Sequence, residues 1–240
     1  MVIRMFKYSY FIILIVFGFS NLGANNVLVF SPHPDDDILG CGGSLVDHKI
    51  KGDSVTTVYI TSGDAAEWRD IPGKDLAIIR ESEAKKASEI IGVTDLVFLR
   101  QPDGAVGYSP DQINEVRELF EKYKPNIVYI PHSKDGHKDH QATFVLVTKA
   151  LKEAIAAMVI EKNSCLVLCY EVWTPLQEIS QKNDITSSID LKLKALSEHV
   201  SQTEVINYVE GIKGLNNYRG IMVAPNHYGY AECFQVHNEE

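Results

Sequence analysis

The sequence predicts an α/β fold, in which helices cover both faces of a mainly parallel, doubly wound β-sheet. Short apolar runs rich in Val, Ile and Tyr alternate along the chain with segments whose apolar residues recur at helical spacing. Several of these runs are apolar almost throughout, which is typical of strands buried on both faces of a parallel sheet. No Pro/Gly/Ser-rich linker interrupts the alternation, so we expect a single domain over residues 25–240.

The apolar runs and the helical patterns give the expected elements in chain order. The strand candidates are NVLVFS from Asn26, SVTTVYIT from Ser54, TDLVFL from Thr94, NIVYIP from Asn126 and CLVLCYEV from Cys165. The helix candidates between them cover residues 75–91, 110–123 and 140–157. A later pattern, Leu191, Leu193, Leu196 and Val200, predicts a helix whose apolar side faces the core or, as the alternative, a dimer partner. Functional sites in such sheets lie beyond the carboxyl ends of the strands.

The first 24 residues resemble an export signal. Arg4 and Lys7 precede the apolar stretch YFIILIVFGF, and small and polar residues follow it. We interpret residues 1–24 as a signal peptide, because the stretch is shorter than the ~20 apolar residues of a spanning helix. The protein is then exported, to the periplasm or the medium. The alternatives are a membrane anchor formed by residues 8–19 and a buried N-terminal helix.

Charge and cysteine usage exclude two classes of function. The net charge of -9 argues against a general nucleic-acid binder, which needs a basic surface to neutralise phosphates. The four cysteines include no C-x-x-C pair, so a zinc site built from thiolates is not indicated. We interpret the cysteines as buried thiols that act as small apolar side chains.

The richest polar cluster, SPHPDDDILGCGG, follows the first strand candidate directly. Three consecutive carboxylates raise one another's pKa, so a nearby cation is the simplest compensation. His33 and Asp36 offer a nitrogen and an oxygen on one tight turn, a pair that suits zinc, while Asp35 between them should point elsewhere. The alternative is that an aspartate, most simply Asp37, caps the following helix. A cap accounts for one carboxylate but not for His33.

The glycines of this cluster do not form a dinucleotide-binding loop. The G-x-G-x-x-G spacing fails, because Gly40, Gly42 and Gly43 are followed directly by Ser44 and Leu45. The carboxylates also stand where a pyrophosphate would have to bind. We therefore expect these glycines to allow a helix to pack closely against a strand.

A second polar cluster, PHSKDGHKDHQA, leaves the fourth strand candidate. A nitrogen ligand from this loop would complete a site of two histidines and one aspartate with an open position, which is typical of catalytic zinc. Asp139 could orient an imidazole by accepting a hydrogen bond from its N–H group. The alternative for any single histidine here, such as His132 or His137, is a solvated side chain in a polar loop.

The two clusters together resemble the PIG-L/LmbE family of zinc-dependent de-N-acetylases, in which HPDD follows the first strand and H-x-D-H follows a later one. Three further segments carry the resemblance, namely RESEAKKASEIIG from Arg80, KALSEHVSQ from Lys194 and YAECF from Tyr230. The matches extend from about Val27 to Phe234. The resemblance implies a Rossmann-like, LmbE-like fold for this chain.

Applied residue by residue, the resemblance implies that His33, Asp36 and His140 bind Zn²⁺. Asp35 would be the general base that deprotonates a water activated by zinc. His137 would stabilise the developing oxyanion and protonate the leaving group. These roles describe hydrolysis of an amide, with zinc lowering the pKa of water and polarising the carbonyl.

Two further positions concern the substrate, and two positions depart from the family pattern. The resemblance makes Arg80 a substrate contact. Asp103, in the turn QPDG, faces the pocket or only forms the turn with its glycine. The sequence departs from the family at Asp37, where Glu is frequent, and at Lys138, where Pro is frequent. Lys138 adds a charge at the mouth of the site.

The expected function is removal of an N-acetyl group from an N-acetylglucosamine-type sugar or conjugate, a small-molecule substrate. The metal hydrolase follows from the residues, and the sugar follows only from the resemblance. Two alternatives stand beside it: a non-catalytic zinc-containing carbohydrate-binding domain, and a zinc amidase that acts on a non-sugar N-acyl substrate. Association with a membrane would depend on the N-terminal segment.

Overall fold

The computed structural model describes residues 23–65, 72–223 and 229–238. The signal peptide and the alternative anchor over residues 8–19 lie outside these ranges, and both stay predictions. Within the described residues, we find no helix with the length and apolar character needed to span a bilayer.

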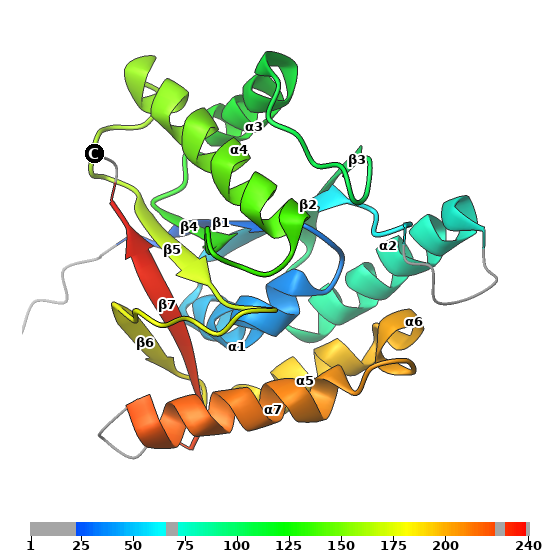
Figure 1. Ribbon diagram of the computed structural model, residues 1–240. Helices are drawn as coiled ribbons and strands as arrows, with labels where there is room; N and C mark the ends of the chain where they lie inside the picture. The colour runs from blue at the N-terminus through cyan, green and yellow to red at the C-terminus, as the bar shows by residue number, and fades with distance from the viewer. Residues whose placement is uncertain (1–22, 66–71, 224–228, 239–240) are drawn as a thin grey trace, which may run out of the picture.

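One seven-stranded sheet forms the centre of the structure, with strand order β3-β2-β1-β4-β5-β7-β6 (Figure 1). The five expected strands are all present and pair in parallel. They are β1 (Asn26–Ser31), β2 (Ser54–Thr61), β3 (Asp95–Gln101), β4 (Ile127–Pro131) and β5 (Leu166–Tyr170). The sheet continues with two antiparallel strands, β7 (Ala231–His237) beside β5 and β6 (Gln181–Asp184) at the edge. The short, polar β6 has no apolar pattern that could have predicted it.

Helices cover both faces of the sheet, as the α/β prediction requires. They are α1 (Asp36–Lys51), α2 (Gly73–Ile90), α3 (Pro110–Tyr123), α4 (Lys138–Ala156), α5 (Ile189–Ser197), α6 (Val200–Thr203) and α7 (Tyr208–Tyr218), followed by a π-helix, η1 (Arg219–Val223). In Figure 1, α3 and α4 lie above the sheet and α1, α5 and α7 lie below it.

Each face of the sheet has its own apolar core. Leu28 of β1 packs in the core between the sheet and helices α3 and α4, whereas its neighbour Val29 packs in the core between the sheet and helices α1 and α5. Successive side chains of a strand point to opposite faces. A strand that is covered on both faces must therefore be apolar at nearly every position, which explains the uninterrupted apolar runs.

The glycines of α1 allow the helix to lie directly on the sheet, as expected. A Cβ atom at Gly40 would lie 2.3 Å from the ring of Tyr170, and one at Gly43 would lie 2.7 Å from Ile185. Tyr170 is fully buried and donates a hydrogen bond to the carbonyl oxygen of Phe30 (2.8 Å). This close contact fixes the start of α1, and with it the turn that carries the first polar cluster.

A buried ion pair joins the last strand to α5, and both of its charges also make hydrogen bonds with α1. Lys192 of α5 donates to the Glu232 carboxylate of β7 (2.7 Å) and to the carbonyl oxygen of Leu39 (2.9 Å). Glu232 also accepts hydrogen bonds from the backbone N–H groups of Gly43 (2.9 Å) and Ser44 (2.8 Å). Because Lys192 and Glu232 are almost inaccessible to solvent, each charge depends on the other for stability.

Candidate active site

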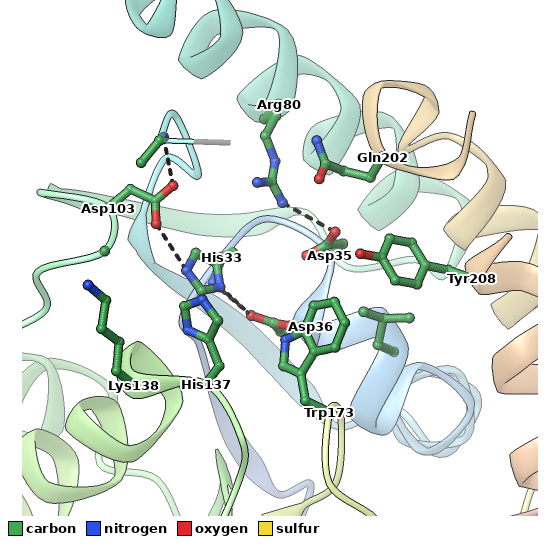
Figure 2. Close-up of a pocket in the computed structure, with 13 residues that line it drawn as sticks. His33, Asp35, Asp36, Arg80, Asp103, His137, Lys138, Trp173, Gln202 and Tyr208 are labelled. Carbon is green, nitrogen blue, oxygen red and sulfur yellow. Dashed lines mark hydrogen bonds and ion pairs between the residues drawn. The ribbon is translucent and has the colours of Figure 1, made fainter. Parts of the chain in front are cut away.

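A pocket of about 440 Å³ opens at the carboxyl ends of the parallel strands (Figure 2). The residues around it come from the segments that follow all five parallel strands and from α1, α2, α4, α6 and α7. The lining residues are His33, Asp35, Asp36, Leu39, Ala65, Arg80, Asp103, Gly104, His137, Lys138, Trp173, Gln202 and Tyr208. Both polar clusters of the sequence therefore meet at the edge of the sheet where α/β proteins bind ligands.

The turn between β1 and α1 places its three aspartates in different surroundings. Asp35, not Asp37, is the N-cap of α1, and its side chain makes no capping hydrogen bond. The interpretation of Asp37 as the cap is therefore wrong, since Asp37 lies one residue inside the helix and accepts a hydrogen bond from the Tyr59 hydroxyl (3.0 Å). Asp35 has a φ of 137°, a conformation that costs a non-glycine residue about 1–3 kcal/mol.

Asp36 contacts both of the other predicted metal ligands. Asp36 Oδ2 lies 3.0 Å from Nδ1 of His33 and 3.1 Å from Nε2 of His140. Burial alone would raise the pKa of Asp36, but the two neighbouring imidazoles hold that pKa well below its usual range. The carboxylate is therefore ionised and faces a nitrogen donor from each polar cluster.

The environment of His140 fits a bound cation. Its ring is fully buried, with carboxylate oxygens of Asp36 and Asp135 at 3.1 and 3.3 Å from its two nitrogens. Neither contact has the geometry of a hydrogen bond, so each nitrogen has a carboxylate neighbour but no hydrogen bond among the described residues. Buried polar atoms without partners are costly, and coordination of a divalent cation would satisfy one of these nitrogens. Two imidazoles and a carboxylate form a donor set that zinc accepts.

Among the described residues, two groups of side chains bring their donor atoms close enough to share a cation, and the predicted set of His33, Asp36 and His140 is not one of them. Ring nitrogens of His33, His137 and His140 lie within 4.8 Å of one another, and so do donor atoms of His33, Asp103 and Asp139. The first group shares His33 and His140 with the predicted ligand set and replaces Asp36 by His137. His33 belongs to every one of these sets.

The predicted base, Asp35, is held in the pocket by Arg80. Nη2 of Arg80 lies 3.2 Å from Asp35 Oδ2, and the same guanidinium donates to the carbonyl oxygens of Gly63 and Pro34, both at 2.9 Å. Burial raises the pKa of Asp35 to about 7, although Arg80 opposes the shift. Arg80 lines the pocket but is itself largely buried. Its role as a substrate contact stays a prediction.

Asp103 and Asp139 both contact His33. Asp103 Oδ1 lies 3.1 Å and Asp139 Oδ2 lies 3.3 Å from Nε2 of His33. Asp139 also accepts a hydrogen bond from the backbone N–H of Gly104 (2.7 Å), so it fixes the turn after β3. Burial works against ionisation of Asp103, but its contact with His33 lowers its pKa to about 2. Asp103 thus both faces the pocket and forms the turn with Gly104. The two alternatives considered for this residue, a pocket residue and a turn residue, therefore both apply.

His137 is the N-cap of α4, and its Nδ1 accepts a hydrogen bond from the backbone N–H of Asp139 (3.2 Å). In the neutral ring the proton therefore lies on Nε2. Burial lowers the pKa of His137, and the neighbouring His33 and His140 lower it further. The side chain lines the pocket, where Nε2–H is a hydrogen-bond donor.

Asp135 is a site residue that sequence analysis did not single out. It is almost completely buried, with Oδ1 3.3 Å from Nδ1 of His140. It accepts hydrogen bonds from the backbone N–H groups of His137 and Trp173, both at 3.0 Å. Asp135 therefore connects the loop between β4 and α4 with the segment that follows β5. The second cluster contains Asp135, but its spacing does not say which aspartate turns inward.

The far wall of the pocket, formed by Trp173, Gln202 and Tyr208, was also not predicted. The Trp173 and Tyr208 rings meet edge to face with centroids 5.9 Å apart, and Gln202 lies in α6. Glu83 of α2 holds α6 in place, because its carboxylate accepts hydrogen bonds from the backbone N–H and the hydroxyl of Ser201, both at 2.7 Å. The segments RESEAKKASEIIG and KALSEHVSQ contain Glu83, Ser201 and Gln202, but nothing in their spacing indicates this contact.

His199 of the HVSQ motif lies behind this wall. Its ring is fully buried, and neither nitrogen has a hydrogen-bond partner among the described residues. Burial lowers its pKa to about 3, and the nearby positive charge of Arg80 adds to the shift. The ring is therefore neutral at physiological pH.

Comparison with known proteins gives a consistent family. The family model described as GlcNAc-PI de-N-acetylase, PIG-L, matches residues 28–151, just over half of the 240-residue chain. A diacetylchitobiose deacetylase of Thermococcus kodakarensis is 28% identical over 189 residues, which cover 73% of this chain and 69% of the relative. A probable N-acetyl-α-D-glucosaminyl L-malate deacetylase 2 of Bacillus anthracis is 27% identical over 187 residues, covering 74% and 81%.

A solved structure has the same fold. The N,N′-diacetylchitobiose deacetylase from Pyrococcus horikoshii superposes with a TM-score of 0.78 at 24% identity, covering 92% of this chain and 87% of that one. At this identity the likeness establishes the architecture, and it confirms the LmbE-like α/β fold expected from the sequence.

Proposed function

Because this chain belongs to the PIG-L family of GlcNAc-PI de-N-acetylases, we propose that it is a zinc-dependent hydrolase that removes the N-acetyl group from an N-acetylglucosamine-type sugar or conjugate. The observation that carries the proposal is the contact of Asp36 with both His33 and His140, beside a second carboxylate in an open pocket. The names of the Thermococcus and Bacillus relatives support the choice of amino sugars.

His33, Asp36 and His140 would hold the zinc ion. When bound, zinc would lower the pKa of a water molecule and polarise the amide carbonyl of the substrate. The nitrogens of His140, which make no hydrogen bond among the described residues, support this assignment, and the contact of Asp139 with His33 supports its role in orienting that ring.

Asp35 would accept the proton of the attacking water. A carboxylate whose pKa lies near 7 is matched to this task at neutral pH. Arg80 keeps the carboxylate at the pocket surface, since their contact of 3.2 Å is made from a guanidinium already anchored to two backbone carbonyls. The strained backbone at Asp35 is consistent with a functional position.

His137 would stabilise the oxyanion that forms when water adds to the carbonyl carbon. Its Nε2–H is the available donor, because Nδ1 is occupied by the backbone N–H of Asp139. When the C–N bond breaks, the amine takes a proton from Asp35, which acquired it from water, or from His137. The products are acetate and the free amino sugar.

Two alternatives from the sequence remain testable. A non-catalytic carbohydrate-binding domain has no need for a strained, buried carboxylate beside the metal ligands, so Asp35 weighs against it. A zinc amidase for a non-sugar N-acyl substrate would use the same groups. The exposed ring of Trp173 at the pocket wall favours a sugar, because aromatic surfaces pack well against partly apolar ligands.

The test is metal analysis of the purified protein combined with a screen for acetate release. The screen contains N,N′-diacetylchitobiose, N-acetyl-α-D-glucosaminyl L-malate and an N-acetyl amino acid. We expect one zinc ion per chain and acetate from a sugar substrate, with loss of activity on chelation and recovery with Zn²⁺. Acetate only from the amino acid would establish the non-sugar amidase. Zinc without any acetate release would favour the binding domain.

For the N-terminal segment, we propose export with removal of the leader within residues 1–24. The charged start and the short apolar stretch support this. Determination of the N-terminus of the mature protein tests it. A mature chain that begins after about residue 20 is expected, whereas an intact Met1 on protein extracted from membranes would indicate an anchor formed by residues 8–19.

A further inference from the structure

Lys138 is an exposed positive charge in the wall of the pocket. Its side chain is exposed, lines the cavity and lies near Gly104, where a Cβ atom would be 3.7 Å from Nζ. Among the described residues it makes no ion pair or side-chain hydrogen bond. Figure 2 shows it beside Asp103 and His137, on the side of the pocket away from Gln202 and Tyr208.

Neither of the nearby carboxylates, Asp103 and Asp139, forms an ion pair with Lys138. Asp103 is engaged by His33 and by the backbone N–H of Ala65 (2.8 Å), and Asp139 is engaged by His33 and by the backbone N–H groups of Gly104 and Val106 (2.7 and 3.2 Å). Both carboxylates therefore already have partners other than Lys138, although they lie in the same part of the pocket.

The position of Lys138 does not stabilise the helix that carries it. It is the first residue of α4, where the helix dipole disfavours a cation by about 0.3–1 kcal/mol. A lysine that neither pairs nor stabilises its helix, at the mouth of a substrate pocket in a chain of net charge -9, is best accounted for by contact with a ligand.

We propose that Lys138 binds an anionic group, a carboxylate or a phosphate, on the substituent that the N-acetylglucosamine unit carries. The inference rests on the proposed function and narrows its substrate class from N-acetylglucosamine conjugates in general to acidic ones. Lysine suits this role because its ammonium is a compact charge that binds either anion without a fixed geometry.

The test compares three substrates in the zinc-loaded protein: N-acetyl-α-D-glucosaminyl L-malate, N-acetylglucosamine 1-phosphate and the neutral N,N′-diacetylchitobiose. Each is assayed with the wild type, Lys138→Met and Lys134→Met. Lys134 is the matched control, since it is an exposed lysine of the loop before α4 that does not line the pocket and makes no ion pair with any residue the structure describes.

We expect Lys138→Met to lower kcat/KM for the acidic conjugates about tenfold more than for diacetylchitobiose. This tenfold difference corresponds to the loss of one charge-assisted contact, and it should arise mainly from a higher KM. The preference of the wild type for acidic conjugates should weaken with added salt. Lys134→Met should leave the ratio between acidic and neutral substrates unchanged. A larger effect on the malate conjugate identifies a carboxylate, and a larger effect on the 1-phosphate identifies a phosphate.

The inference is overturned if Lys138→Met changes all three substrates by the same factor, or if Lys134→Met changes the ratio as much. If the wild type releases acetate from none of them, the proposed function fails. Calorimetric binding of the malate conjugate to wild type and Lys138→Met then decides the inference separately. Tenfold weaker binding to the variant supports an acidic-ligand site, and equal or absent binding rejects it.

Discussion

Two buried polar clusters of this protein differ in how completely their groups are paired. In the cluster of Lys192 and Glu232, opposite charges meet at 2.7 Å, and backbone groups of α1 satisfy the remaining oxygens. In the pocket, by contrast, Asp35 and Asp36 are adjacent carboxylates, and both nitrogens of the buried His140 lack a hydrogen-bond partner among the described residues.

The difference separates a structural cluster from a functional one. A fully paired buried cluster holds elements together and has nothing left to offer a ligand. An incompletely paired cluster costs stability unless a cation or a substrate completes it. Substitutions in the first cluster should therefore reduce stability, and substitutions in the second should reduce metal binding and activity.

The largest expected effect is loss of the metal. Asp36→Ala and His140→Ala should each abolish stoichiometric zinc binding and reduce hydrolysis below detection, because each removes one of three protein ligands. Elemental analysis after dialysis and acetate release measure the two effects. His137→Ala is the comparison, and we expect it to retain zinc. If His137→Ala loses the metal while Asp36→Ala keeps it, the third donor is His137.

The next effect separates catalysis from metal binding. Asp35→Asn should retain zinc and lower kcat by about 10²–10⁴-fold, because the amide cannot accept the proton of water. Steady-state kinetics and metal content of the same preparation measure this. Asp111→Asn, an exposed change in the first turn of α3, is the control and should be fully active. A fully active Asp35→Asn protein would remove Asp35 from the mechanism.

The paired cluster should respond in stability alone. Lys192→Met should lower the free energy of unfolding by about 3–5 kcal/mol, since it leaves Glu232 buried without its counter-charge. Urea titration measures this, and activity per folded molecule should be unchanged. The double variant Lys192→Met/Glu232→Gln should recover part of the loss. No recovery would mean that packing, and not the unpaired charge, causes it.

The smallest expected effect concerns the packing below the pocket. Gly40→Ala should cost about 1–3 kcal/mol, because its Cβ would lie 2.3 Å from the buried Tyr170 ring. Gly214→Ala is the matched control within α7, where a Cβ meets no atom within 4 Å, and it should raise stability by about 0.5–1 kcal/mol. Thermal or urea unfolding measures both. Equal changes in the two variants would contradict the close packing of α1.

The parallel strands and the two polar clusters could be predicted because their signals are local. A strand covered on both faces shows its burial in every residue, as β1 and β2 do. The edge strand β6 reads QKND and has no such signal, so only its pairing with β7 reveals it. Asp135 and Asp139 are similar in sequence context, and the packing of the loop decides that Asp135 contacts His140 while Asp139 contacts His33.

The sequence by itself determined the parallel α/β core and the clusters of His and Asp at two strand ends, because apolar periodicity and residue spacing act over short stretches of chain. The tertiary structure decided that Asp35 is the N-cap and meets Arg80, and that Trp173, Gln202 and Tyr208 close the far side of the pocket. These features depend on contacts between segments distant in sequence, and such contacts form only when α2, α6 and α7 pack around the sheet.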